Sequence, residues 1–178
     1  MELEFTNLSM MDLRSSPGDI LDRVYKNGEA FIIERNGQPK ACLVPIYLFC
    51  PDIPKDKVNN ELEDLRRAGE SPILRISEKK ELEIIFKEKN ADFEVTLKIV
   101  LPHGYPNVAP KVFASPISTK APHRWQDGAL CLFGTTIGWN PGTHNIAFVL
   151  KSARKWLSCY REWSEKGSWP VERKDDNE

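Results

Sequence analysis

Cys131 is the residue of this chain whose surroundings best suit covalent chemistry. It follows a proline-stiffened segment, Leu101-Pro102-His103-Gly104-Tyr105-Pro106-Asn107-Val108-Ala109-Pro110. Prolines fix φ and remove donors, so such a segment can cross a sheet edge without leaving unpaired amides. A single cysteine held behind a stiff connection is what a thioester carrier needs. The competing interpretation of Cys131 is a small buried hydrophobe between Leu130 and Leu132.

The four cysteines, Cys42, Cys50, Cys131 and Cys159, have no paired spacing. The chain also shows no basic flank of an export signal, so we expect thiols rather than a disulfide or zinc framework. For Cys42, Cys50 and Cys159, which fall on a predicted strand, a loop edge and a predicted helix, we expect packing roles. The tryptophans Trp156, Trp163 and Trp169 are predicted either to pack in the hydrophobic core or to line a groove that binds a partner.

Three polar residues near Cys131 are candidates for supporting roles. His123 either makes a structural hydrogen bond or tunes the pKa of the thiolate. Asp127, followed by Gly128, either shapes a turn or orients an attacking lysine. His144 either serves as a base for an incoming amine or is a solvated residue at a helix start.

Hydrophobic periodicity predicts the elements that position these residues. A helix from Glu61 to Ala68 is expected, capped by Asn59 or Asn60 and stopped by Gly69. Strands are predicted at Ile73–Ile76, Leu82–Phe86, Phe93–Leu101 and Lys111–Ala114. The third of these alternates apolar and polar residues, which is typical of a strand buried on one face. A long helix from Asn145 to Trp163 completes this part, with one apolar face formed by Ile146, Val149, Leu150, Ala153, Leu157 and Tyr160.

The first part of the chain predicts a strand, a helix and a hairpin, in that order. The strand is expected from Glu2 to Leu8, and the helix from Leu13 to Lys26, ending at Asn27-Gly28. Its apolar side is predicted to consist of Leu13, Ile20, Leu21 and Val24. The dipeptide Asn36-Gly37 between Ala30–Glu34 and Pro39–Val44 is the strongest short hairpin signal.

Composition and net charge limit the classes of function that this chain can have. The chain is 40% hydrophobic and 29% charged, which is ordinary for a globular protein. No stretch approaches the roughly 18 apolar residues needed to span a bilayer, so we expect a cytoplasmic protein with no membrane partner. Residues 1–57 hold seven Lys/Arg against nine Asp/Glu and residues 58–178 hold eighteen against seventeen, giving −2 and +1. The net charge of neither part therefore favours binding to nucleic acid.

The second part resembles the ubiquitin-conjugating enzymes. The matching residues are Tyr105-Pro106 with Pro110, the eight-position interval from Cys131 to Trp139, and Trp139-Asn140-Pro141 ahead of the long helix. The resemblance implies an α+β fold, an antiparallel meander flanked by helices. It also implies that Cys131 carries a ubiquitin-like modifier or another acyl group, delivered by an activating enzyme, with no cofactor or metal. Tyr105, Pro106, Trp139 and Pro141 are the implied partner-binding residues.

One family motif is altered. Where the family has His-Pro-Asn, with an asparagine amide that can stabilise the developing oxyanion, this chain has His123-Arg124-Trp125. This departure, with the aromatic residues of the last helix, is similar to the divergent bacterial branch found in antiphage CBASS-type operons. The resemblance implies a CD-NTase-type nucleotidyltransferase as a further candidate partner.

Residues 1–50 resemble the N-terminal domain of prevent-host-death (Phd/YefM) antitoxins. The resemblance lies in Ile20-Leu21-Asp22-Arg23-Val24, Ile32-Ile33-Glu34-Arg35-Asn36-Gly37 and Ala41-Cys42-Leu43-Val44-Pro45. It implies a homodimer formed through the hairpin sheet and operator DNA as a partner. The residues that would inherit DNA contact are Arg14, Arg23, Arg35 and Lys40.

The predicted organisation is an antitoxin-like domain at 1–50, a proline-containing linker at 51–58, a ubiquitin-conjugating-like domain at 59–170 and a polar tail at 171–178. Two functions follow from it. The first is acyl transfer through a Cys131 thioester to an amine or thiol. The second is a non-catalytic module, in which the first domain binds DNA and the second binds a partner.

Overall fold

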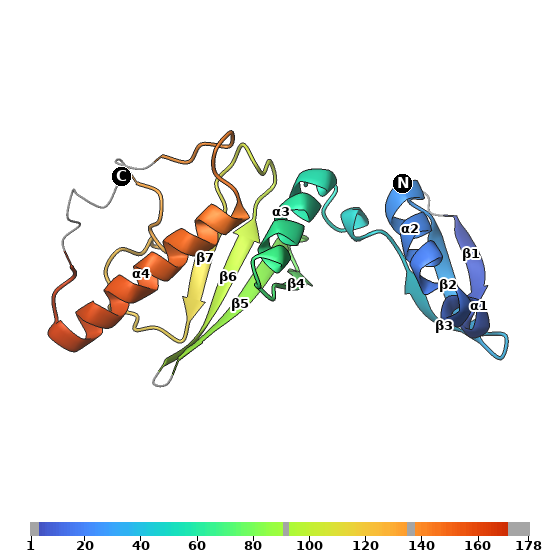
Figure 1. Cartoon of the computed structure of the whole chain (residues 1–178), viewed down its shortest axis with the longest axis horizontal. Coiled ribbons are helices and arrows are strands. Elements are labelled where there is room, and N and C mark those ends of the chain that lie inside the picture. The colour runs from blue at the N-terminus through green and yellow to red at the C-terminus, as the bar shows by residue number, and fades with distance from the viewer. Residues whose placement is uncertain (1–3, 91–92, 135–137, 171–178) are drawn as a thin grey trace. The chain divides into compact units, whose positions relative to one another are not determined.

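The computed structural model describes residues 4–90, 93–134 and 138–170. The chain forms two compact units, Met1–Pro51 and Asp52–Glu178 (Figure 1). Both units combine helices with a sheet, so the α+β class expected from the sequence is confirmed. Glu2 and Leu3 of the first predicted strand, and the predicted tail at 171–178, lie outside the described residues.

The first unit is a three-stranded sheet covered by two helices. Its elements are β1 (Phe5–Ser9), α1 (Met10–Ser15), α2 (Pro17–Asn27), β2 (Ala30–Arg35), β3 (Gln38–Leu43) and a 3-10 turn, η1 (Ile46–Leu48). The central strand β2 pairs in parallel with β1 and antiparallel with β3. The small core consists of Leu8, Ile20, Val24 and Phe31.

The predicted hairpin is confirmed, whereas the predicted helix is corrected. Asn36 and Gly37 both have positive φ, 54° and 70°, as a two-residue type I′ turn requires. The single helix expected from Leu13 to Lys26 is two helices that meet at Ser16, because Pro17 has no N–H to donate and starts a new helix. Leu21 is 55% exposed and lies outside the core, contrary to expectation.

The second unit is a four-stranded antiparallel meander with two helices. Its elements are α3 (Lys55–Arg67), β4 (Ile73–Ile76), β5 (Leu82–Asn90), β6 (Phe93–Leu101), β7 (Lys111–Ser115) and α4 (Ile146–Lys166), with strand order β4-β5-β6-β7. The alternation predicted for the third strand is confirmed at Val95, Leu97, Ile99 and Leu101, all buried. Helix α4 packs against β6 and α3 (Figure 1).

Helix α3 begins earlier than predicted. It starts at Lys55, within the segment expected to be linker, so Asn59 and Asn60 lie inside the helix and do not cap it. Val58 is buried and continues the apolar spacing through Leu62 and Leu65. Burial of this longer stripe outweighs the preference of asparagine for helix caps.

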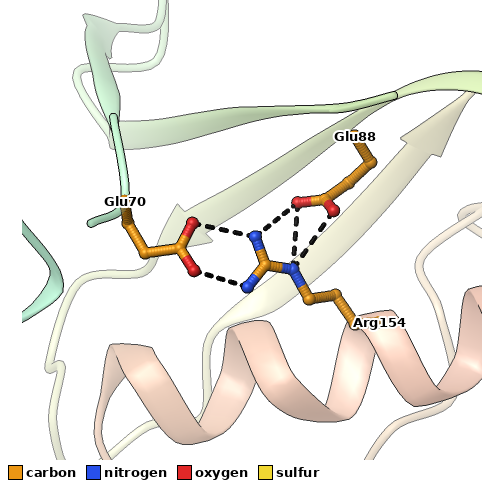
Figure 2. A network of polar contacts seen from close by, with 3 residues as sticks. All are labelled: Glu70, Glu88 and Arg154. Carbon is orange, nitrogen blue, oxygen red and sulfur yellow. Dashed lines mark hydrogen bonds and ion pairs between the residues drawn. The ribbon is translucent and has the colours of Figure 1, made fainter. Parts of the chain in front are cut away.

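A network centred on Arg154 fastens α4 to two other parts of the second unit (Figure 2). Its guanidinium group donates to both carboxylate oxygens of Glu70, which follows α3, at 2.5 and 2.8 Å, and to Glu88 of β5 at 2.9 to 3.1 Å. The hydrogen bond from Arg154 lowers the pKa of Glu70. Within the described residues, no helix is long and apolar enough to cross a membrane.

Candidate functional site

Cys131 lies in the connection between β7 and α4, with its backbone fixed on both sides. Its N–H donates to the carbonyl of His123 at 2.9 Å, and the N–H of Leu130 donates to the carbonyl of Val112 in β7 at 2.7 Å. Leu130 is 3% exposed, but Cys131 itself is only partly buried. This partial exposure favours an accessible thiol over the buried-hydrophobe interpretation.

His123 acts on this segment through its backbone. It adopts a left-handed conformation, φ 54°, which non-glycine residues seldom use. Its carbonyl oxygen accepts from the indole Nε1 of Trp156 as well as from Cys131 N–H, both at 2.9 Å. The exposed imidazole ring packs on Trp169, with 4.8 Å between ring centroids. These contacts are the ones that the structural interpretation of His123 requires.

Between His123 and Cys131 the chain makes a tight turn. Trp125 N–H donates to the carbonyl of Ala129 at 2.8 Å, and Arg124 bridges to Leu130. The Arg124 guanidinium donates to the carbonyl oxygens of Gly128, at 3.2 Å, and Ser118, at 3.3 Å. Trp125 remains 55% exposed. Arg124 is thus committed to shaping the turn that carries the exposed indole.

Asp127 stabilises the same turn. Its Oδ1 accepts from Ala129 N–H at 3.0 Å and its Oδ2 from the ammonium group of Lys111 at 2.6 Å. The hydrogen bond from Lys111, followed by that from the Ala129 backbone, lowers the pKa of Asp127. With both oxygens engaged, the turn-forming role fits Asp127 better than orientation of a substrate lysine.

An aromatic cluster lies beside the cysteine segment. Phe133 packs edge-on against Trp139, with centroids 5.4 Å apart, and is stacked with His144 and Phe148 at 6.4 Å. Trp139 Nε1 donates to the carbonyl oxygen of Pro106 at 2.6 Å. Two predicted partner-binding residues, Pro106 and Trp139, are therefore brought together.

His144 offers a donor in this cluster. Asn140 N–H donates to His144 Nδ1 at 3.0 Å, and the imidazole stacks on Phe148 at 4.0 Å. A backbone N–H can only donate, so Nδ1 carries the lone pair and the neutral ring has its proton on Nε2. This geometry argues against His144 as a base and leaves an Nε2–H available to donate.

The remaining partner-binding candidates differ in exposure. Pro141 is exposed, as a contact residue would be. Tyr105 is 2% exposed, so it has a structural role and does not offer its ring to a partner. Its hydroxyl donates to Glu61 Oε2 at 2.6 Å, and burial, with this neighbouring carboxylate, raises the pKa of Tyr105.

Glu61 is a residue that the sequence analysis missed. It is 7% exposed, and its Oε2 also accepts from Ile146 N–H, at 2.9 Å, at the start of α4. Lys57 Nζ lies 2.8 Å from the other oxygen. One carboxylate thus joins α3, the Tyr105 segment and α4. The available signal was a glutamate on the apolar face formed by Val58, Leu62 and Leu65.

The predicted DNA-binding residues lie on the first unit. Arg14, Arg35 and Lys40 are exposed, and Lys40 Nζ donates to Gln38 Oε1 at 2.8 Å. Arg23 is engaged by Glu29, 2.6 Å away, and lies over the Phe31 ring at 4.9 Å. Arg23 is therefore less suited to phosphate contact than Arg14 and Arg35.

All four cysteines lie in described segments, and none forms a disulfide. Cys50 is buried, as expected for a packing role, but Cys42 is exposed because β3 is an edge strand of the sheet. Cys159 is partly buried on α4. The part of the chain that the structure describes contains no cluster of side chains able to hold a metal ion.

Comparisons with known proteins bear on the second unit. The family model described as "Type II CBASS E2 protein" matches residues 62–176. Among solved structures, "A complex of the Vps23 UEV with ubiquitin" is similar, at 14% identity and a TM-score of 0.42, over 64% of this chain and 89% of that chain. No curated protein matches the sequence.

Proposed function

This chain belongs to the type II CBASS E2 family, and from this premise we propose that it carries a ubiquitin-like modifier or another acyl group as a thioester on Cys131. The observation that supports the proposal most is the partly exposed Cys131, whose backbone is held by the His123 carbonyl and by β7. A nucleophile fixed in this way loses little entropy when it meets an activated acyl group.

The proposed chemistry has two steps. The Cys131 thiolate attacks the carbonyl carbon of an activated acyl group, an S–C bond forms, and the activating group leaves with its electron pair. An amine or thiol then attacks the same carbon, and the S–C bond breaks with the electron pair returning to the Cys131 sulfur. The attacking group releases its proton to solvent or a base. A thiolate is a good leaving group towards amines, which suits a carrier of this kind.

The proposed partners follow from the family. They are a ubiquitin-like modifier with its activating enzyme, or a CD-NTase-type nucleotidyltransferase of the same CBASS system. The surface of the second unit offers Pro106 and Trp139, joined by their 2.6 Å hydrogen bond, and the exposed Pro141 and Trp125. Tryptophan is enriched among residues that dominate binding energy, so this surface suits a protein partner.

Thioester formation can be tested directly. Incubation with the cognate activating enzyme, ATP and modifier should give an adduct that reducing agent removes, and Cys131→Ala should abolish it. Cys42→Ala and Cys159→Ala are matched controls, because Cys42 is exposed and Cys159 is partly exposed. An adduct that persists in Cys131→Ala, or the absence of any adduct with a proven cognate pair, contradicts the proposal.

A non-catalytic binding module is the second candidate function. It is favoured by the segment His123-Arg124-Trp125, which has no amide side chain, and by the commitment of Arg124 to the carbonyls of Gly128 and Ser118. In this segment, neither an amide side chain nor an unengaged Arg124 guanidinium is available to donate to a developing oxyanion. Complex formation with a CBASS partner that survives in Cys131→Ala, without any adduct in the wild type, would support this function.

For the first unit we propose a Phd/YefM-like dimerisation role. Two observations support this role. The elements follow in the order strand, helix and hairpin, and every residue from Gln38 to Cys42 of the edge strand β3 is exposed. Edge strands carry unpaired backbone groups that a second copy can satisfy. Operator DNA would be contacted chiefly by Arg14 and Arg35.

A further inference from the structure

The residues that follow α4 turn back towards the cysteine segment. Gly167 ends the helix in a left-handed conformation, φ 75°, and its N–H donates to the Trp163 carbonyl at 2.8 Å. The side chain of Trp169 then packs on Trp156 of α4, with 5.3 Å between ring centroids, and on His123, at 4.8 Å. Residues 167–170 are called the strap below.

His123 is the residue on which this contact acts. A non-glycine residue in the left-handed region persists when its surroundings over-determine it. Here two tryptophans provide that constraint: Trp156 donates its indole N–H to the His123 carbonyl, and Trp169 packs on the imidazole ring. The same carbonyl accepts Cys131 N–H, so any rotation at His123 changes the hydrogen bond of the proposed nucleophile.

We propose that Trp169 is a positioning residue for Cys131: the strap packs Trp169 on both the His123 ring and Trp156, and the His123 carbonyl in turn fixes the backbone and exposure of the thiol. This inference rests on the proposed function for its significance. Its test does not, because it measures the thiol without any transfer partner.

A purely structural role for the strap would have a different consequence. Trp156, Tyr160 and Trp163 form an aromatic row on α4, with centroid distances of 5.5 and 5.8 Å. If Trp169 only completed this row, its loss would affect α4 as a whole. Positioning instead predicts a local effect, confined to the segment from His123 to Cys131.

Thiol alkylation separates the two roles within one molecule. The full chain is treated with iodoacetamide, and the alkylation rates of individual cysteines are measured by mass spectrometry of the peptides. Exposed Cys42, in the first unit, is the internal reference, and Cys159, on α4, reports on that helix. Loss of one aromatic contact shifts a local opening equilibrium by about two- to tenfold. Trp169→Ala should therefore raise the rate at Cys131 relative to Cys42 by that factor and leave Cys159 unchanged.

Two further variants control the result. Trp169→Phe keeps an aromatic ring against His123 and should restore most of the wild-type rate. Trp163→Ala removes a comparable ring from the same end of α4, where it packs on Tyr160, and should not change Cys131. An unchanged ratio of Cys131 to Cys42 in Trp169→Ala overturns the proposal, and so does an equal change in Trp163→Ala.

Amide hydrogen exchange provides an independent measurement if Trp169→Ala is unstable. In Trp169→Ala, or in the milder Trp169→Leu if the alanine variant does not fold, exchange of Cys131 N–H should accelerate more than exchange in β6, whereas Trp169→Phe should exchange like the wild type. Equal acceleration in β6 would show general destabilisation and contradict a positioning role. A wild-type chain that never forms a thioester would refute the proposed function but would leave this result intact.

Discussion

The two units of this chain use charged side chains in opposite ways. In the second unit, two carboxylates are buried: Glu61 and Glu83 are 7% and 4% exposed. Arg154 also forms ion pairs with Glu70 and Glu88, which lie in separate parts of the unit (Figure 2). In the first unit the described buried residues are apolar, and ion pairs such as Lys26 with Asp22 lie at the surface.

This difference in the burial of charged side chains indicates which part of each unit is suited to its proposed function. Burial alone would raise the pKa of Glu83, but hydrogen bonds from Lys98 and Arg75 lower it below the ordinary value. Breaking buried pairs of this kind is costly, whereas exposed pairs contribute little. The second unit therefore uses carboxylates to join its helices and strands to one another. The first unit presents exposed polar side chains and an edge strand, so its role depends on what binds there.

The largest expected effect concerns assembly. The full-length chain should be a dimer, and a truncated chain that begins at Asp52, where the second unit starts, should be a monomer. The physical reason is that only the first unit supplies the proposed pairing edge β3. Analytical ultracentrifugation of both proteins measures the change. If the truncated chain is equally dimeric, the antitoxin-like assembly is wrong for residues 1–50.

The next effect tests the buried carboxylates of the second unit. Glu61→Ala removes the acceptor shared by the Tyr105 hydroxyl and Ile146 N–H, and should lower the free energy of unfolding by about 3 kcal/mol. The control is Glu63→Ala on the same helix, which loses only an exposed pair with Arg67 and should cost less than about 0.5 kcal/mol. Urea titration of both variants measures the difference. Equal costs would show that the buried carboxylate stabilises the second unit no more than an exposed one does.

A smaller, pH-dependent effect is expected at Arg154. Its side chain is 41% exposed, so after solvent screening Arg154→Ala should lower stability by about 1 kcal/mol at neutral pH. The folded-state pKa of Glu70 is lowered, so its contribution is present above the ordinary value of 4.5 and is lost as the pH falls through the lowered folded value. The difference between wild type and variant should therefore shrink below pH 4.5. Thermal unfolding as a function of pH checks this, with the exposed Arg67→Ala as control.

The smallest effect concerns DNA. A dimer that contacts phosphates through Arg14 and Arg35 makes four such contacts, which gives a log-log salt slope of about −4. Arg14→Ala should flatten it by nearly two units, whereas Arg23→Ala should leave it unchanged, because Glu29 already holds Arg23. Gel-shift titration of the promoter fragment at several salt concentrations measures both slopes. No retardation of the wild type at low salt would leave the first unit with dimerisation alone.

Local patterns predicted most of the elements. The alternation from Val95 to Leu101, the Asn36-Gly37 turn and the glycine after α2 each depend on neighbours within a few residues, and the structure confirms them. The start of α3 was wrong because two possible caps, Asn59 and Asn60, lie within a stripe that is buried by the rest of the second unit. A cap preference is weaker than burial of an apolar face.

The sequence by itself indicated the meander and the long helix, because local periodicity carries that information, and its resemblance to the ubiquitin-conjugating enzymes made Cys131 the candidate nucleophile. Only the tertiary structure showed that Glu61 joins Tyr105 to Ile146, that His144 Nδ1 accepts a hydrogen bond from Asn140 N–H, and that Trp169 returns to pack on His123. The Glu61 and Trp169 contacts join residues far apart in the chain, so they depend on where the helices meet the sheet. The His144 contact depends on how the Asn140 segment folds back on itself. Residue types alone do not specify either geometry.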